Sequence, residues 1–262
     1  MGKDQTVLFH STVFGPIHSR RLGVSLGINL GPDDGKVCSF DCLYCEAGFN
    51  AQGTGTTGMP LKDRVYRDLR NKLISMKDKG ENLDVITFSG NGEPTLHPDF
   101  PEIIDEVLTL RDEFYPDAKV SVLTNSTRIF SDKVAEALEK VDNNILKLDS
   151  AIEETMQMID RPNSPGFTVS KLIEGLKRFS GSGIIQTMFL RGSHEGQPVD
   201  NTGSKEVEAL INAYKEIRPR EIMIYSLDRS TPEEKLVKVE REELAKIGEK
   251  IEKETGITVK IA

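Results

Sequence analysis

The sequence has no apolar run long enough to cross a membrane, no recognisable secretory leader and no low-complexity segment. A membrane-spanning helix needs about 20 predominantly apolar residues, so we expect no membrane partner. The first twelve residues, MGKDQTVLFHST, contain an early acidic residue and lack the apolar centre of a secretory signal. We therefore expect the protein to act in the cytoplasm.

Positive charge is also scarce. The chain has 34 Lys and Arg residues against 42 Asp and Glu, which gives a net charge of -8. Broad nucleic-acid surfaces are rich in Lys and Arg, and an acidic chain is a poor candidate for one. A local basic patch is not excluded, so a nucleic-acid partner stays possible but disfavoured.

Cysteine is rare, and its distribution is uneven. The 262 residues contain three cysteines, Cys38, Cys42 and Cys45, all within the stretch KVCSFDCLYCEAG at 36–48. An odd number of cysteines in a reducing compartment does not make a disulfide framework. The cluster therefore favours metal binding or redox chemistry.

The rest of the chain alternates between short apolar runs and helical periods, with no visible domain boundary, so we predict one domain over residues 1–262. We predict strands at 22–30, 84–90, 119–125, 144–150, 183–192 and 221–228, with an edge strand at 257–261. We predict helices at 61–79, 99–115, 131–139, 168–179, 204–217 and 241–254, and a polar loop at 193–203.

This alternation predicts an α/β fold of parallel strands with helical crossovers. Six such units and a terminal strand fit a partial, open (β/α)6 barrel of the TIM-like kind better than a full eightfold barrel. Ligand sites in these folds gather where the strands end, at their carboxyl edge. The residues that follow each predicted strand are therefore the candidates for a site.

The cysteine stretch follows the first predicted strand and has the spacing C-x3-C-x2-C. A closed zinc site needs four ligands, and the fourth would have to be one of four distant histidines: His10, His18, His97 or His194. A [4Fe–4S] cluster on three thiolates keeps one iron without a protein ligand. We favour this site-differentiated cluster, in which an exogenous molecule binds the open iron.

A C-x3-C-x-aromatic-C motif after the first strand of such a barrel resembles the radical S-adenosylmethionine (SAM) superfamily, with Tyr44 as the aromatic residue. The resemblance implies that SAM binds the open iron of the [4Fe–4S] cluster. It also implies that the reduced cluster cleaves SAM to methionine and a 5′-deoxyadenosyl radical, which abstracts hydrogen from a substrate. An electron donor such as flavodoxin or ferredoxin is then expected as a partner.

The stretch FSGNGEPTLHP after the second strand matches the Gly-Gly-Glu-type segment of that superfamily, through Gly90, Asn91, Gly92 and Glu93. The resemblance implies that this segment holds the methionine amino group of SAM. Taken alone, it would be an ordinary glycine-rich turn before a helix. Asn125 and Ser126, after the third strand, are candidates for SAM binding or for helix capping.

The fourth strand, NILKLDS, carries two charged residues on one face, because strand side chains alternate. Lys147 and Asp149 either point into the barrel, which is costly for charges without a functional partner, or outward into solvent. We favour the inward orientation, with Asp149 binding cofactor and Lys147 in a catalytic or substrate-binding role. Arg161, Arg191 and Tyr225, together with Asp228 and Arg229, complete the predicted rim.

Longer segments resemble one group within the superfamily, the Fe–S oxidoreductases related to the 4-demethylwyosine (wyosine-base) synthases. They are GPIHSRRLGVSLGINLGP with its pair Arg20-Arg21, GNGEPTLHP, LKLDS with RPN, and IYSLDRSTPEE. Those synthases rebuild a transfer-RNA guanosine with pyruvate and carry a second cluster, for which this chain has no cysteine left. Lys147 alone is weak support for a pyruvate Schiff base.

Three hypotheses follow. The first is a single-cluster radical SAM enzyme with an unidentified substrate. The second is a tRNA-modifying relative of the wyosine synthases, which the net charge disfavours. The third is a non-enzymatic Fe–S or zinc protein, which the Gly90–Glu93 stretch contradicts. We favour the first.

Overall fold

The computed structural model describes residues 7–19 and 22–262. The strands are β1 (Val13–Ser19), β2 (Gly23–Ile28), β3 (Val85–Phe88), β4 (Lys119–Thr124), β5 (Asn143–Lys147), β6 (Ile184–Met188), β7 (Leu190–His194), β8 (Gln197–Asp200), β9 (Glu221–Tyr225), β10 (Leu236–Lys238) and β11 (Val259–Ile261). The helices are α1 (Lys62–Asp78), α2 (Phe100–Phe114), α3 (Asp132–Lys140), α4 (Glu153–Asp160), α5 (Val169–Leu176), α6 (Ser204–Ile217) and α7 (Arg241–Thr255).

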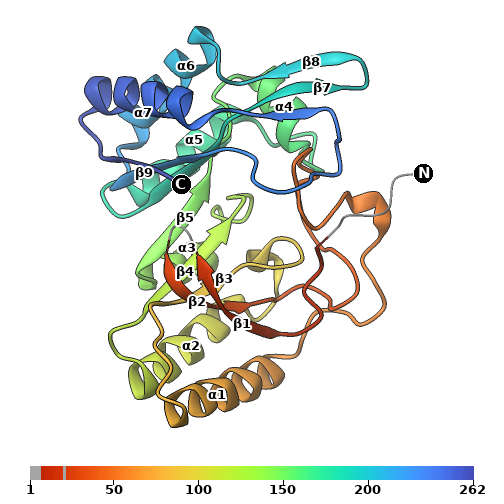
Figure 1. Cartoon of the computed structure of the whole chain (residues 1–262), viewed down its shortest axis with the longest axis vertical. Helices are drawn as coiled ribbons and strands as arrows, with labels where there is room; N and C mark the ends of the chain where they lie inside the picture. Colours follow the sequence, from red (N-terminus) through yellow and green to blue (C-terminus); the bar gives the residue numbers. More distant parts are fainter. Residues whose placement is uncertain (1–6, 20–21) are drawn as a thin grey trace.

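The main sheet has eight strands in the order β1-β2-β3-β4-β5-β6-β9-β11. All neighbours from β2 to β11 pair in parallel, and only β1 is antiparallel. Six parallel strands, β2 to β9 in the sheet, thus form an open barrel wall, which confirms the predicted partial (β/α)6 architecture. In Figure 1, α1 and α2 lie by β1–β4, whereas α5, α6 and α7 gather around β9 at the other end of the sheet.

Side-chain alternation along the barrel strands separates two faces. Residues such as Leu26, Ile86 and Val122 are buried in the large core between the sheet and the helices. The side chains that alternate with such core residues along each strand point into the barrel instead. Among them, Ile145, Ile184 and Met223 form a second, smaller apolar cluster. The sheet is therefore buried on both faces, as parallel sheets are.

The predicted helices are confirmed, with boundaries that differ by no more than one residue except at 168–179. The one at 168–179 is divided into α5 and a 3-10 turn at Lys177–Phe179. Helix α4, at Glu153–Asp160, was not predicted, because its eight residues give too short a period to stand out. It places Arg161 at its carboxyl end, in left-handed backbone conformation.

The prediction for 183–203 was wrong in two ways. The single strand predicted at 183–192 is divided at Phe189 into β6 and β7, because β7 leaves the barrel to join a separate sheet of order β10-β7-β8. The predicted polar loop at 193–203 contains β8, which pairs antiparallel with β7. Tertiary pairing with β10, some 40 residues later, decides this arrangement, and the local sequence does not show it.

The amino-terminal hairpin was also not predicted. Strand β1 pairs with β2, and the register of this pairing shifts between Phe14 and Ile17. Because the shift interrupts the alternation of side chains along β1, its sequence shows no regular period-two pattern. The arginine pair Arg20-Arg21, between β1 and β2, lies outside the described residues. Within the described part of the chain, no helix combines the length and the apolar character that crossing a membrane requires. That residues 1–262 form one domain stays a prediction.

Candidate active site

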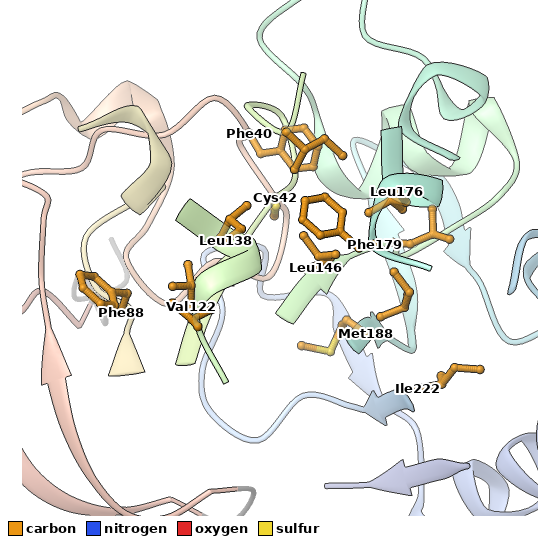
Figure 2. Packing of buried hydrophobic residues seen from close by; sticks show 14 of the residues in the cluster. Phe40, Cys42, Phe88, Val122, Leu138, Leu146, Leu176, Phe179, Met188 and Ile222 are labelled. Atoms are coloured by element: carbon orange, nitrogen blue, oxygen red, sulfur yellow. The ribbon is translucent and has the colours of Figure 1, made fainter. Parts of the chain in front are cut away.

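The cysteine loop, residues 36–48, follows β2 at the carboxyl edge of the sheet and is anchored in the core. Phe40 and Leu43 are fully buried. The backbone N–H of Leu43 donates to the carbonyl of Ile159, and that of Asp41 donates to the carbonyl of Asp160. Figure 2 shows Cys42 within the core, close to Phe40. Apolar anchors and contacts with the end of α4 thus fix the loop that carries the thiols.

All three thiols are free, with Cys42 buried and Cys38 and Cys45 partly exposed. The Cys38 Sγ accepts from the backbone N–H of Phe40 and from Asn125 Nδ2, both at 3.5 Å. Burial, and then the charge of Glu93, raise the pKa of Cys38 to about 11. Burial also raises the pKa of Cys42 well above its ordinary value, opposed by Lys147 and reinforced by Asp160 and the other two thiols. Burial thus opposes the thiolate form at both of these positions.

The buried side chain of Lys36 binds two other residues of the cysteine loop. Its ammonium group donates to the carbonyl of Gly48 at 2.8 Å and lies 3.7 Å from the Asp41 carboxylate, and its side chain is almost wholly buried. A buried ammonium group needs such partners to offset its lost hydration. Lys36 therefore joins the two ends of the loop, a role that its sequence position did not reveal.

The Gly90–Glu93 segment packs directly against the cysteine loop. The carbonyl of Val37 accepts the N–H of Glu93 at 2.9 Å, and the N–H of Val37 donates to the carbonyl of Asn91. Gly92 has φ of 120°, and a Cβ there would lie 1.9 Å from the Val37 oxygen, so only glycine fits. Because Gly92 has no side chain, the Gly90–Glu93 segment can pack this closely against the cysteine loop.

The side chain of Asn91 fixes the amino-terminal segment. It accepts from the N–H of Phe9 at 2.9 Å and donates to the carbonyls of Phe9 and Pro32 at 2.8 and 2.7 Å. With these bonds its amide group is satisfied inside the protein. The role of Asn91 toward SAM stays a prediction, and the structure adds a structural role.

Glu93 joins the ends of β3 and β4. Its carboxylate accepts four hydrogen bonds, from the backbone N–H and the hydroxyl of Thr95, from the hydroxyl of Thr124 and from the backbone N–H of Asn125. Burial raises the pKa of Glu93, and these hydrogen bonds oppose the increase. A carboxylate with this many internal donors holds the strand ends together.

Asn125 contacts the cysteine loop, and neither Asn125 nor Ser126 caps the helix that follows. Asn125 Nδ2 also donates to the hydroxyl of Ser39 at 2.9 Å, and its Oδ1 accepts from Thr127. Ser126 has φ of +69° and is fully buried, with its hydroxyl 3.5 Å from the Lys147 carbonyl. Asn125 therefore links β4 to Cys38 through its own amide group.

Lys147 and Asp149 point inward and form a cluster with the cysteine loop. The Lys147 ammonium group contacts the hydroxyl of Tyr44, lies 4.5 Å from the centre of that ring and is 3.2 Å from the Asp149 carboxylate. It also lies 3.9 Å from Cys42 Sγ and 3.8 Å from Asp160. Of the two orientations that alternation left open, the structure therefore has the inward one that we favoured.

Burial and neighbouring charges both change the pKa values of the groups in this cluster. Burial lowers the pKa of Lys147, but Asp149, Cys42 and Asp160 outweigh it and hold that pKa well above its ordinary value. Burial, and then the charge of Asp149, raise the pKa of Tyr44 and also that of Asp160. Asp149 is 1% exposed, receives hydrogen bonds from Tyr44 and from the N–H of Met188, and is thus already well bonded within the protein.

The predicted rim residues divide into two groups. Arg161 lies 3.6 Å from the Asp41 carboxylate and over the ring of Phe49, next to the cysteine loop. Tyr225 is at the end of β9 and is partly buried against the large core. Arg191 instead pairs with Glu243 of α7 and lies 3.4 Å from Asp200 in β8. The structure thus brings Arg161 to the cysteine loop and holds Arg191 on the separate small sheet.

A cavity of about 330 Å³ opens beside Cys45 and Gly90 and extends into the barrel. Its mouth carries Glu46 and Arg229, whose charged groups pair at 2.6 Å. Its inner wall includes Ser25, Thr87 and Gln186. None of these three was predicted as a site residue, although period-two alternation within the predicted strands could have identified them as inward-facing polar residues.

Comparison with known proteins adds to this geometry. The family model of the radical SAM superfamily matches residues 34–200. A UPF0026 protein of Synechocystis is 31% identical, over 84% of this chain and 77% of its own length. A longer Brachyspira hyodysenteriae protein named GTPase Obg is 29% identical over 99% of this chain, which spans only 36% of it. The name of that protein is therefore not transferred to this chain.

Solved structures show the same fold at low sequence identity. A radical SAM methyltransferase from Sphaerobacter thermophilus has a TM-score of 0.68 at 16% identity, over 91% of this chain and 65% of that one. TYW1 with a bound lysine–pyruvate adduct has a TM-score of 0.59 at 13% identity, over 89% and 75%. Together with the match of the family model over most of the chain, these findings show that the protein belongs to the radical SAM superfamily of enzymes.

Proposed function

We propose that this chain is a single-cluster radical SAM enzyme that binds a [4Fe–4S] cluster through Cys38, Cys42 and Cys45 and acts on a substrate of its own. The proposal depends on one observation above all. The only three cysteines of the chain are free and lie in one loop at the carboxyl edge of the barrel, where a cavity reaches Cys45. Ligand sites of such barrels lie at this edge.

The donor set fits an iron–sulfur cluster. Within the described residues, no three His, Cys, Asp or Glu side chains are arranged so that they could hold one metal ion. A four-iron cluster does not need that arrangement, because each thiolate binds a different iron. The three thiols leave one iron for SAM, as the superfamily match implies. When bound, such a cluster supplies the electron that splits SAM into methionine and a 5′-deoxyadenosyl radical.

The residues around the thiols have distinct proposed roles. Asn125 and the backbone of Phe40 donate to Cys38 and would orient its sulfur. The Lys147 ammonium group lies beside Cys42, where a positive charge favours a thiolate. Tyr44 and Asp149 hold Lys147 in place, and Gly90 borders the cavity in which we expect SAM. A reductant such as flavodoxin or ferredoxin would complete the reaction.

The test is reconstitution of the full chain with iron and sulfide without oxygen. We expect about four irons and four sulfides per chain, and release of 5′-deoxyadenosine and methionine when dithionite and SAM are added. A variant with all three cysteines replaced by alanine serves as the control. Stoichiometric zinc without iron uptake, or equal SAM cleavage by the triple variant, would overturn the proposal.

A further inference from the structure

The Lys147 ammonium group, at the end of β5, lies against the sulfur atom of one proposed cluster ligand. Its Nζ donates to Cys42 Sγ at 3.9 Å. Cys42 is 7% exposed, and the Lys147 side chain is 16% exposed. A charge acts more strongly on a neighbouring group where water is largely excluded, because the local dielectric constant is low. The charge of Lys147 is therefore well placed to act on a group bound by Cys42.

Tyr44 and Asp149 hold the ammonium group in this position. The Asp149 carboxylate lies 3.2 Å from Nζ, the Tyr44 hydroxyl contacts it, and the Tyr44 ring centre is 4.5 Å away. The Tyr44 hydroxyl also donates to Asp149, which accepts the N–H of Met188 as well. A lysine stem is flexible by itself, but these contacts keep the positive charge beside Cys42.

A carboxylate lies against the same sulfur atom. The Cys42 thiol donates to Asp160 Oδ1 at 3.5 Å, and Asp160 is 1% exposed. Metal ions bind the thiolate form of cysteine, so metal binding removes the proton that joins these two groups. The sulfur atom and the carboxylate would then face each other inside the protein. Lys147 Nζ is 3.8 Å from Asp160 Oδ1, so its charge lies beside both of them.

The other buried lysine of the site has a different position. The Lys36 ammonium group donates to the carbonyl of Gly48 and lies 3.7 Å from the Asp41 carboxylate, so it joins parts of the cysteine loop to one another. Lys147 belongs to β5, outside that loop, and its ammonium group reaches a sulfur atom. The contacts therefore indicate that Lys36 holds the loop, whereas Lys147 acts on a ligand atom.

We propose that Lys147 is a positioning residue that acts through Cys42 to raise the reduction potential of the cluster. The inference rests on the proposed function and gives Lys147 a role toward the cluster in place of one toward a substrate. The potential of an Fe–S cluster depends on nearby charge and on hydrogen bonds to its sulfur atoms. An added electron makes the cluster more negative, and a fixed positive charge beside Cys42 favours that state. Lys147 thereby eases the reduction that SAM cleavage requires.

A redox titration of the anaerobically reconstituted protein tests this role, with the reduced cluster followed by electron paramagnetic resonance. Lys147→Met, of similar length but uncharged, should lower the midpoint potential by about 60 mV or more, which is a tenfold smaller ratio of reduced to oxidised cluster at a given potential. Lys147→Arg keeps the charge and should recover most of that loss. Lys205→Met, at an exposed position of α6, is the matched control and should leave the potential unchanged.

Loss of the ammonium group also leaves the Asp149 carboxylate without its cationic partner, so the substitution is repeated in a second background. Asp149→Asn combined with Lys147→Met should have a lower midpoint potential than Asp149→Asn alone. Since neither protein has a carboxylate at position 149, this pair isolates the charge of Lys147. The iron content of each variant verifies that the cluster is present.

An unchanged potential in Lys147→Met, or an equal loss in Lys147→Arg, would overturn the inference. Failure of both proteins with Lys147→Met to take up iron would also overturn it, because a residue that adjusts the potential is not required for assembly. A wild type that forms no cluster contradicts the proposed function and, with it, this inference. A wild type that forms the cluster and cleaves SAM, but has the same potential as Lys147→Met, contradicts this inference alone.

Discussion

Two loops at the same edge of the barrel use their side chains in opposite ways. The loop after β2 presents three thiols, none of which is in a disulfide. The loop after β3 has its polar side chains already bonded, since Asn91 holds the amino-terminal segment and the Glu93 carboxylate accepts four hydrogen bonds. The comparison teaches that two adjacent motif segments can differ in role: we propose that the first binds the cofactor, whereas the second uses its polar groups to hold neighbouring segments in place.

The largest expected effect comes from the thiols. Replacing any one of Cys38, Cys42 or Cys45 by alanine should abolish SAM cleavage, because the chain has no other cysteine to replace a lost ligand. The free energy of unfolding of the metal-free protein should change by less than about 1 kcal/mol, because the substitution is small. Iron content, 5′-deoxyadenosine release and urea denaturation measure both. Full activity in any single variant would show that the loop does not bind the cofactor as proposed.

In contrast to the cysteine substitutions, Glu93→Ala should lower the stability of the metal-free protein. Four donors lose their acceptor in a buried place, so we expect a loss of about 3 kcal/mol in the free energy of unfolding of the metal-free protein. Urea denaturation measures it, with Glu249→Ala, at an exposed position of α7, as the control. If Glu93→Ala is as stable as wild type, the contrast between the two loops is lost.

Lys36→Met tests whether the cysteine loop also contains a purely structural residue. Without the bond from its ammonium group to Gly48, the loop should hold the cluster less firmly. We expect iron release to a chelator to be about tenfold faster, as for other residues that orient metal ligands. Lys205→Met, at an exposed position of α6, is the control. Equal rates of iron release from wild type and Lys36→Met would show that Lys36 does not help the loop to hold the cluster.

Asp142, just before β5 at the opposite end of the strands, should give the smallest effect. Burial raises its pKa, but the N–H of Val120, then Arg111 and Lys119, outweigh it and lower the pKa below the ordinary value. A lowered pKa stabilises the fold above the unfolded value of about 3.9 and loses that effect as pH falls through the folded pKa.

Asp142→Asn should therefore cost about 1 kcal/mol at pH 7, with the difference from wild type shrinking below about pH 4. Urea denaturation at several pH values measures it, and the exposed Asp117→Asn provides the baseline. A difference that grows on acidification would show that the sign assigned to the Asp142 pKa is incorrect.

Much of the fold followed from local pattern. Six parallel strands, six of the seven helices and the carboxyl-edge position of Cys38, Cys42 and Cys45 were predicted, because apolar periods and loop composition act over a few residues. Period-two alternation put Lys147 and Asp149 on one face, and the inward orientation was favoured because buried charged groups mark functional sites. The β7–β8 hairpin was missed, since it depends on pairing with β10, which lies far along the chain.

The sequence by itself determined the superfamily and the fold class, because three thiols within eight residues lie in one loop and strands and helices alternate along the chain. Only the tertiary structure decided how the other motif residues are used. Glu93 meets Thr124 and Arg191 meets Glu243, and the two pairs are 31 and 52 residues apart. Such contacts depend on strand register and loop packing, which bring distant residues within hydrogen-bond distance.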